Sequence, residues 1–183
     1  MDYKNGIWVF GYGSLMWNPG FAYARRQQAC LSGYTRAFCL WSVHYRGTAE
    51  SPGLVLGLDK QAGAACEGVA YYVPEDQAEQ AHLYLQEREL VSYAYLEKVE
   101  MLTLDSGEMV PAICYIVDRR HSQYAAGLSL AAKAEVIARA CGSAGANLDY
   151  LENTLAHMQG LGITDAECAA LLAMIRSPVP SPD

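Results

Sequence analysis

The residue types best suited to chemistry lie where an apolar run ends in two glycines. Residues 7–10, Ile-Trp-Val-Phe, are followed by Gly11, Tyr12, Gly13, Ser14 and Leu15. Large β-favouring side chains before Gly-Tyr-Gly-Ser predict a buried strand that delivers a tight turn. Successive N–H groups in such a turn can converge on a carboxylate or on a developing oxyanion. The segment therefore predicts an anion-binding cradle; the alternative is a glycine-rich strand end that binds nothing.

A Gly-x-Gly pattern after a strand also opens dinucleotide-binding folds. That fingerprint needs a third glycine three residues after the second, and this chain has Met16 there. The pattern therefore disfavours a dinucleotide, and we expect no cofactor.

The second candidate is a carboxylate on a predicted helix. Pro74 and the acidic residues 75 and 76 suit a helix N-terminus, and helical spacing continues to about Leu90. The inward stripe of this helix comprises Ala78, Ala81, His82 and Leu85. At 100° per residue, Glu89 falls about 20° from the centre of that stripe. We therefore expect Glu89 to point inward and Glu87 to be solvated.

A carboxylate on a buried helix face suits proton transfer. Burial costs free energy unless the group is paired or neutralised, and desolvation raises its pKa. The alternatives for Glu89 are that it pairs with a neighbouring arginine or lies beyond the helix end.

The third candidate is Arg46, in the polar loop of residues 43–53 between two predicted strands. A guanidinium can hold a carboxylate with two hydrogen bonds. The alternative is an ordinary surface arginine.

The elements that must position these residues form an α+β pattern. Alternating hydrophobicity predicts strands at 7–10, 34–42, 54–58, 68–73, 95–104 and 109–117, with a hairpin turn at 105–107. Helices are predicted at 128–141, ending at Gly142, and near 147–158, with a capping box at Thr164 and Glu167 starting a third. We expect one domain at 1–176, mostly antiparallel sheet, and a disordered proline-rich tail at 177–183.

Composition excludes several functional classes. The chain has 183 residues, 52% of them hydrophobic, and a net charge of −7. The negative charge argues against nucleic acid and anionic membranes as partners, and no apolar run approaches membrane-spanning length. The six cysteines form no C-x-x-C pair and the four histidines match no ligand spacing. We expect reduced thiols in a cytoplasmic protein, most of them core fillers, and no metal site.

Four short motifs resemble, in order and spacing, those of the ChaC-type γ-glutamylcyclotransferases. They are Phe10 to Leu15; Arg46-Gly47 with Pro52-Gly53; Tyr84-Leu85 with Arg88-Glu89; and Gly142 to Gly145 with Asn147 and residues 149–151. The match covers about residues 7–175. The chain departs from several relatives after Glu89, where Leu-Val-Ser-Tyr-Ala-Tyr replaces glycines, and before Arg46, where His44-Tyr45 replaces Asp-His.

The resemblance implies a γ-glutamylcyclotransferase-like mixed sheet or small barrel with flanking helices. It implies an enzyme that cleaves glutathione, a small-molecule substrate, into 5-oxoproline and cysteinylglycine, with Glu89 as the catalytic residue. The implied substrate-binding residues are Val9, Phe10, Gly11, Tyr12, Gly13, Ser14 and Leu15. Arg46 is a candidate partner for the distal carboxylate of the tripeptide, a pairing that the resemblance does not fix.

The implied reaction needs no nucleophilic side chain, because the substrate's own α-amine attacks its γ-carbonyl. Ser14 is therefore expected to be a hydrogen-bonding turn residue. Two alternatives stay open: a cyclotransferase for other γ-glutamyl amines or amino acids, and a non-catalytic binding or regulatory module.

Overall fold

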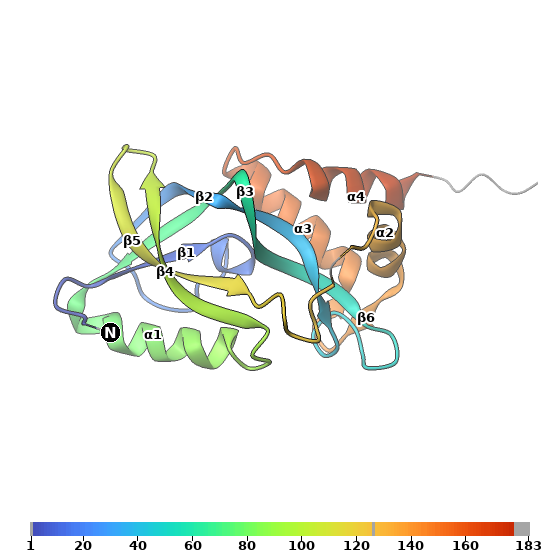
Figure 1. The fold of residues 1–183 in the computed structure, drawn as a ribbon, viewed down its shortest axis with the longest axis horizontal. Coiled ribbons are helices and arrows are strands. Elements are labelled where there is room, and N and C mark those ends of the chain that lie inside the picture. Colours follow the sequence, from blue (N-terminus) through green and yellow to red (C-terminus); the bar gives the residue numbers. More distant parts are fainter. Residues whose placement is uncertain (1, 126, 178–183) are drawn as a thin grey trace, which may run out of the picture. The chain divides into compact units, whose positions relative to one another are not determined.

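The computed structural model describes residues 2–125 and 127–177 (Figure 1). These residues form two compact units. The first comprises the described residues up to Arg36 together with Gly57–Tyr124. The second comprises Ala37–Leu56 and the described residues from Ala125 onward. The prediction of one domain at 1–176 is not tested by this division and stays a prediction, and tail residues 178–183 lie outside the described residues.

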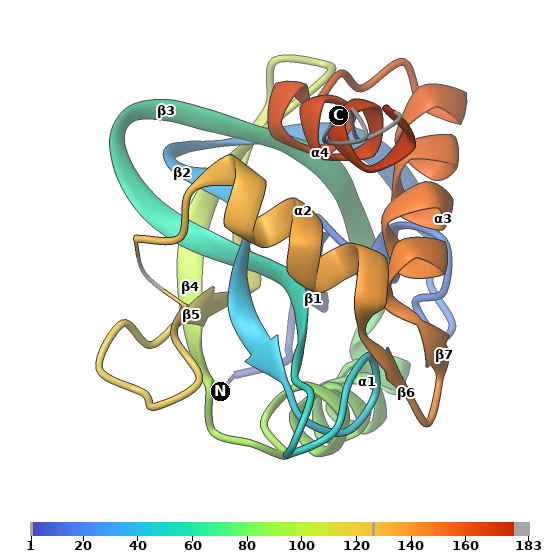
Figure 2. The same cartoon turned by 90° about the vertical axis from the view of Figure 1, so that its right-hand side faces the viewer.

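Five strands close into a barrel in the order β1-β3-β2-β4-β5. They are β1 (Ile7–Gly11), β2 (Arg25–Ser42), β3 (Gly53–Val73), β4 (Tyr95–Leu104) and β5 (Met109–Val117). β1 pairs with β3 in antiparallel and with β5 in parallel orientation, and β4 pairs antiparallel with both β2 and β5. The long curves of β2 and β3 are visible in Figure 2. The predicted mixed, mostly antiparallel barrel is therefore confirmed.

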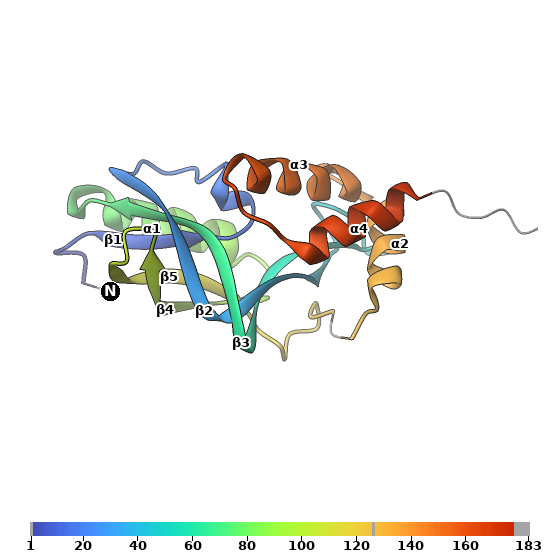
Figure 3. The same ribbon diagram turned by 90° about the horizontal axis from the view of Figure 1, so that it is seen from above.

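β1 is apolar throughout because both of its faces are buried. Trp8 and Phe10 enter the cluster inside the barrel. Ile7 and Val9 enter a second cluster with Ala78 and other residues of helix α1 (Glu75–Glu89). Alternate residues of a strand point to opposite faces, so one strand contributes to both clusters. α1 lies alongside the strands of the first unit (Figures 1 and 3).

Two strands are longer than predicted. β2 begins at Arg25 rather than at residue 34, and β3 is continuous where two strands were predicted. The added segments, 25–33 and 59–67, carry many polar and exposed residues, so their hydrophobicity does not alternate. Backbone pairing with the neighbouring strands of the barrel extends them beyond the apolar pattern.

The second unit contains three helices, which gather in Figure 2. They are α2 (Leu130–Arg139), α3 (Asn147–Gly160) and α4 (Ala166–Arg176), with a small hairpin of β6 (Cys141–Gly142) and β7 (Gly145–Ala146) between the first two. The predicted first helix is shorter than 128–141, because it begins after its N-cap Ser129 and Gly142 belongs to β6.

The predicted capping box of α4 is wrong. The Asp165 side chain caps the helix instead, accepting from the Cys168 amide at 2.9 Å. Glu167 accepts from the Phe38 amide at 3.1 Å and pairs with Lys133 at 2.8 Å. Tertiary partners therefore occupy the carboxylate that the local pattern assigned to the cap.

The buried Asn147 ties α3 to β3. Its side-chain oxygen accepts from the Leu54 amide and its nitrogen donates to the Leu54 carbonyl, both at 2.7 Å. We expect Asn147→Ala to lower the free energy of unfolding by about 2–4 kcal/mol, because two buried backbone groups lose their partners. Urea denaturation measures this, with Asn153→Ala on the exposed face of α3 as the control, expected within about 0.5 kcal/mol of wild type. Equal stability of the two variants would contradict the structural role of Asn147.

All six cysteines are thiols, and four of them are buried, as expected for core fillers. Burial, reinforced by the charge of Glu100, raises the pKa of Cys114 to about 12. Burial also raises the pKa of Cys30, with Glu67 adding to the effect. Within the described ranges, no helix has the length and apolar character needed to span a bilayer.

Candidate active site

The glycine-flanked turn follows β1 directly. β1 ends at Gly11, and a short 3-10 helix, η1 (Ser14–Met16), begins after Gly13. A Cβ at Gly11 would lie 3.1 Å from the Leu15 Cβ and 3.2 Å from the Met16 nitrogen. Glycine at this position therefore allows the chain to fold back tightly on the end of the strand.

Buried side chains hold the carbonyls of this turn. Arg36, only 6% exposed, donates through Nε to the Tyr12 carbonyl and through Nη2 to the Glu67 carbonyl. The Tyr71 hydroxyl lies 3.0 Å from the Leu15 carbonyl oxygen and 2.8 Å from that of Met16, so its single proton is shared between these two acceptors. Hydrogen bonds to its carbonyl groups therefore fix the conformation of the turn.

The amides of the turn are left available. In a trans peptide the N–H points away from the preceding C=O, so the Gly13 N–H is directed away from Arg36. Within residues 2–125 and 127–177, no hydrogen-bond acceptor is found for the amides of Gly13, Ser14 and Leu15. Such amides have the donor character expected of an anion cradle.

Val9 and Phe10 differ from the rest of the predicted binding segment because they belong to the buried strand β1. Both side chains are fully buried, and both residues are paired with β3. Their packing places the turn, and binding through these two residues stays a prediction.

Glu89 is the last residue of α1 and points inward, as the helical spacing predicted. The inward stripe of Ala78, Ala81, His82 and Leu85 is buried. The Glu89 side chain is 18% exposed, whereas Glu87 is exposed. Burial raises the pKa of Glu89, and the charge of Arg88 opposes that rise only in part. Glu89 therefore does pair with a neighbouring arginine, which was the alternative interpretation. Its pKa is raised in spite of this pairing.

Arg88 connects this carboxylate to the turn. Its Nε lies 3.1 Å from Glu89 Oε1, and its Nη2 donates to Ser14 Oγ at 3.0 Å. Its Nη1 donates to the carbonyls of Asn18 and Pro19, at 2.7 and 3.3 Å, and to the Tyr84 hydroxyl at 3.2 Å. One guanidinium therefore brings the two predicted halves of the site together.

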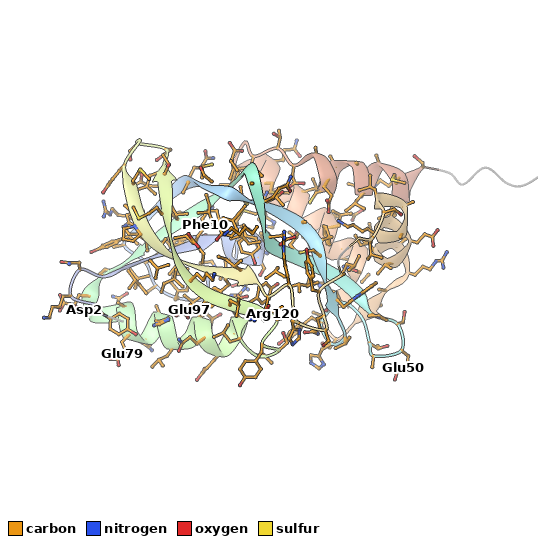
Figure 4. The ribbon with its side chains drawn as sticks, viewed as in Figure 1. Asp2, Phe10, Glu50, Glu79, Glu97 and Arg120 are labelled. Atoms are coloured by element: carbon orange, nitrogen blue, oxygen red, sulfur yellow. The ribbon has the colours of Figure 1, made fainter. Side chains whose placement is uncertain are left out.

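A second polar network lies under the inner face of α1. His82 Nε2 is 2.8 Å from Glu97 Oε1, and Tyr3 Oη is 2.8 Å from His82 Nδ1. The Tyr115 hydroxyl donates to Glu97 Oε2 at 3.1 Å, and Gln86 donates to the same oxygen at 3.2 Å. Figure 4 shows Glu97 on the barrel side of α1 and Glu79 on the opposite side.

Tyr115 connects this network to the turn and to Glu89. Its carbonyl accepts from the Tyr12 hydroxyl at 3.1 Å. Burial and the charges of Glu97 and Glu89 raise the pKa of the Tyr115 phenol, so the phenol is neutral at ordinary pH.

Arg46 belongs to the second unit. Its Nη1 donates to the carbonyls of Ala144 and Ala146, at 2.6 and 3.2 Å, and its guanidinium lies 5.4 Å from the centre of the Tyr150 ring. Arg46 therefore supports the β6–β7 hairpin. Among the described residues, its Nη2 and Nε have no hydrogen-bond acceptor, which leaves one edge of the guanidinium for a carboxylate.

Sequence reasoning missed two arginines. Arg88 appeared only as part of a motif, and its contacts with the turn are distant in sequence. Arg36 has a signal that could have revealed it, because it alternates with the buried Tyr34, Phe38 and Leu40 in β2. A charged residue on the buried face of a strand requires partners. Within the described ranges, no cluster of three or more histidine, cysteine or acidic side chains could hold a metal ion.

The fold and the site define a protein of the γ-glutamyl cyclotransferase class. The structure matches the crystal structure of a selenomethionine-labelled γ-glutamyl cyclotransferase specific to glutathione from yeast, with a TM-score of 0.83 and 25% identity. The match covers 93% of this chain and 96% of the yeast chain.

Within that class, the chain belongs to the family described as ChaC-like protein, whose profile matches residues 7–178. It is 39% identical to the glutathione-specific γ-glutamylcyclotransferase of Escherichia coli K12, over 93% of this chain and 73% of that protein. It is 34% identical to glutathione-specific γ-glutamylcyclotransferase 1 of Danio rerio, over 94% of this chain and 92% of that protein. The family suggested by the four motifs is therefore confirmed.

Proposed function

We propose that this protein is a γ-glutamylcyclotransferase that cleaves reduced glutathione to 5-oxoproline and cysteinylglycine. The observation that carries the proposal is the contact of one guanidinium, that of Arg88, with both Ser14 in the glycine turn and Glu89. This contact supports the proposal because it links an inward carboxylate of raised pKa to the turn whose amides can receive an anion. The relatives named above support glutathione as the substrate.

The reaction is an intramolecular acyl transfer. The α-amine nitrogen of the γ-glutamyl group bonds to its own γ-carbonyl carbon, and the bond from that carbon to the cysteine nitrogen breaks. The α-ammonium nitrogen loses two protons as it becomes the lactam N–H, and the departing amide nitrogen gains two as it becomes the ammonium of cysteinylglycine. Holding the chain in attack geometry can contribute about 7–11 kcal/mol, so binding supplies much of the catalysis.

Glu89 is the proposed carrier of the proton. A carboxylate can accept a proton from the ammonium and return it to the leaving nitrogen, and it does so best when its pKa approaches the working pH. Burial moves the pKa of Glu89 in that direction. The positive charge of Arg88 compensates the buried Glu89 carboxylate when that carboxylate is ionised.

The turn is the proposed oxyanion site. Attack places negative charge on the γ-carbonyl oxygen, and each oriented amide donor can be worth about 3–4 kcal/mol there. Ser14 is proposed to have a structural role, because its Oγ accepts a hydrogen bond from Arg88 Nη2. A guanidinium cannot take up a proton, so this contact does not activate Ser14 as a nucleophile.

Incubation of the purified protein with reduced glutathione tests the proposal. Mass spectrometry should detect 5-oxoproline and cysteinylglycine in equal amounts. Release of 5-oxoproline from other γ-glutamyl amines at comparable rates would favour the broader cyclotransferase. Absence of any release would favour the non-catalytic module. A cytoplasmic location stays a prediction from cysteine usage.

Arg46 is the proposed reader of the tripeptide's distal carboxylate, and its open edge supports this. We expect Arg46→Ala to lower kcat/KM for reduced glutathione roughly ten- to a hundredfold, by loss of a charged hydrogen bond. The loss should be smaller for γ-glutamylcysteine, which lacks that carboxylate. Because Arg46 also supports the hairpin, the melting temperature of the variant must be measured alongside. Equal losses for both substrates would assign Arg46 to the scaffold alone.

A further inference from the structure

The contacts of Arg88 exceed what an ordinary salt bridge requires. Its side chain is 22% exposed, and its three nitrogens point to three different partners. Nε faces Glu89 and Nη2 faces Ser14 Oγ, while Nη1 reaches the carbonyls of Asn18 and Pro19. The planar guanidinium fixes the angles between these directions. The turn, the loop that follows it and the carboxylate are therefore held in one mutual geometry.

These contacts also argue against a role for Arg88 in binding the substrate directly. A guanidinium that clamps a substrate carboxylate in the bidentate manner offers it two parallel donors. Each nitrogen of Arg88 already has a partner within the protein. Arg88 therefore acts on the site through the groups that it holds.

The charges around Glu89 are few. On α1 it faces Arg88, and from β5 the neutral phenol of Tyr115 is within electrostatic range. Glu97 of β4 reaches the region through its hydrogen bond with Tyr115, and its other carboxylate oxygen lies 2.8 Å from His82 Nε2. Arg88 is the charged group in direct contact with Glu89.

We propose that Arg88 is a positioning residue with two separable effects: its fork fixes the Ser14 turn against Glu89, and its charge keeps that carboxylate ionised for proton uptake. The inference rests on the proposed role of Glu89 as proton carrier. Geometry and charge can be removed independently, because lysine retains the charge and lacks the fork, whereas glutamine lacks both.

The experiment is the pH profile of kcat/KM for 5-oxoproline release from reduced glutathione, with the full-length protein. Below the pKa of Glu89 the carboxylate is protonated and cannot accept, so activity falls on the acid side. Arg88→Gln removes the charge that lowers this pKa, so its acid limb should move to higher pH. Relative to its own plateau, activity on that limb should be about threefold to tenfold below wild type.

Arg88→Lys should give the complementary result. Its acid limb should stay close to that of wild type, because the positive charge is retained. Its plateau kcat should fall roughly tenfold or more, since small errors of alignment between reacting groups are costly. Arg120→Lys is the control: the Arg120 side chain is 85% exposed, so its profile should match wild type.

Two results would overturn the proposal. One is an acid limb of Arg88→Gln that coincides with wild type. The other is full plateau activity in Arg88→Lys. If Arg88→Gln does not fold, a cycle of Ser14→Ala and Arg88→Lys decides, because residues that act through one contact give non-additive losses; additive losses would reject the positioning role. Wild-type release of 5-oxoproline is measured in the same series, so failure of this inference and failure of the proposed function give different results.

Discussion

Glu89→Gln is expected to reduce turnover of reduced glutathione by at least about 100-fold, the lower range for general acid–base catalysis. The amide keeps the size of the side chain and its ability to accept from Arg88, so the end of α1 should stay in place. What it loses is the ability to bind and release a proton. Steady-state release of 5-oxoproline measures the effect, and circular dichroism checks the fold.

Glu87→Gln is the matched control, because Glu87 lies on the exposed face of the same helix turn. Its turnover should stay within a few-fold of wild type. Near-full activity in Glu89→Gln, together with a loss in Glu87→Gln, would reject Glu89 as the proton carrier and require another base in the site.

Gly13→Val is expected to abolish detectable glutathione binding, because a β-branched side chain would stand where an N–H is expected to face the substrate. Gly13 is buried and stands at the N-terminal end of η1. Its N–H points away from the Tyr12 carbonyl that Arg36 holds. A β-branched side chain there would occupy the space beside the available amides.

Calorimetry on the folded variant measures this binding. Gly160→Val provides the control, because a Cβ at Gly160, the last residue of α3, meets no atom within 4 Å apart from its chain neighbours and the backbone of its own helix. The control should bind as wild type does. Tight binding of glutathione by Gly13→Val would mean that the turn has only a structural role.

The sequence predicted most of the fold because many elements are defined by local patterns. The continuous apolar run of β1 indicated burial on both faces, and the inward stripe of α1 correctly oriented Glu89. The errors occur where tertiary contacts override a local pattern. The polar halves of β2 and β3 join the barrel through backbone pairing, and Glu167 leaves the α4 cap for Phe38 and Lys133.

The candidate site was predicted only in part for a related reason. Glycine turns and helix faces are local, so the turn and Glu89 could be identified as candidates from the sequence. The contact that joins them spans 74 residues, from Arg88 to Ser14. Likewise, the guanidinium that fixes the Tyr12 carbonyl lies 24 residues away, in β2. No local periodicity reports on such contacts, although an arginine on a buried strand face indicates that one exists.

The raised pKa of Cys114 matters if glutathione is the substrate, because oxidised glutathione is a disulfide that reacts with thiolates. Only a thiolate attacks a disulfide, so a thiol that stays protonated exchanges slowly with oxidised glutathione. With a pKa of about 12, Cys114 is almost wholly protonated at neutral pH, and its burial also blocks access. Cys114 is therefore resistant to mixed-disulfide formation with oxidised glutathione, the disulfide form of the proposed substrate.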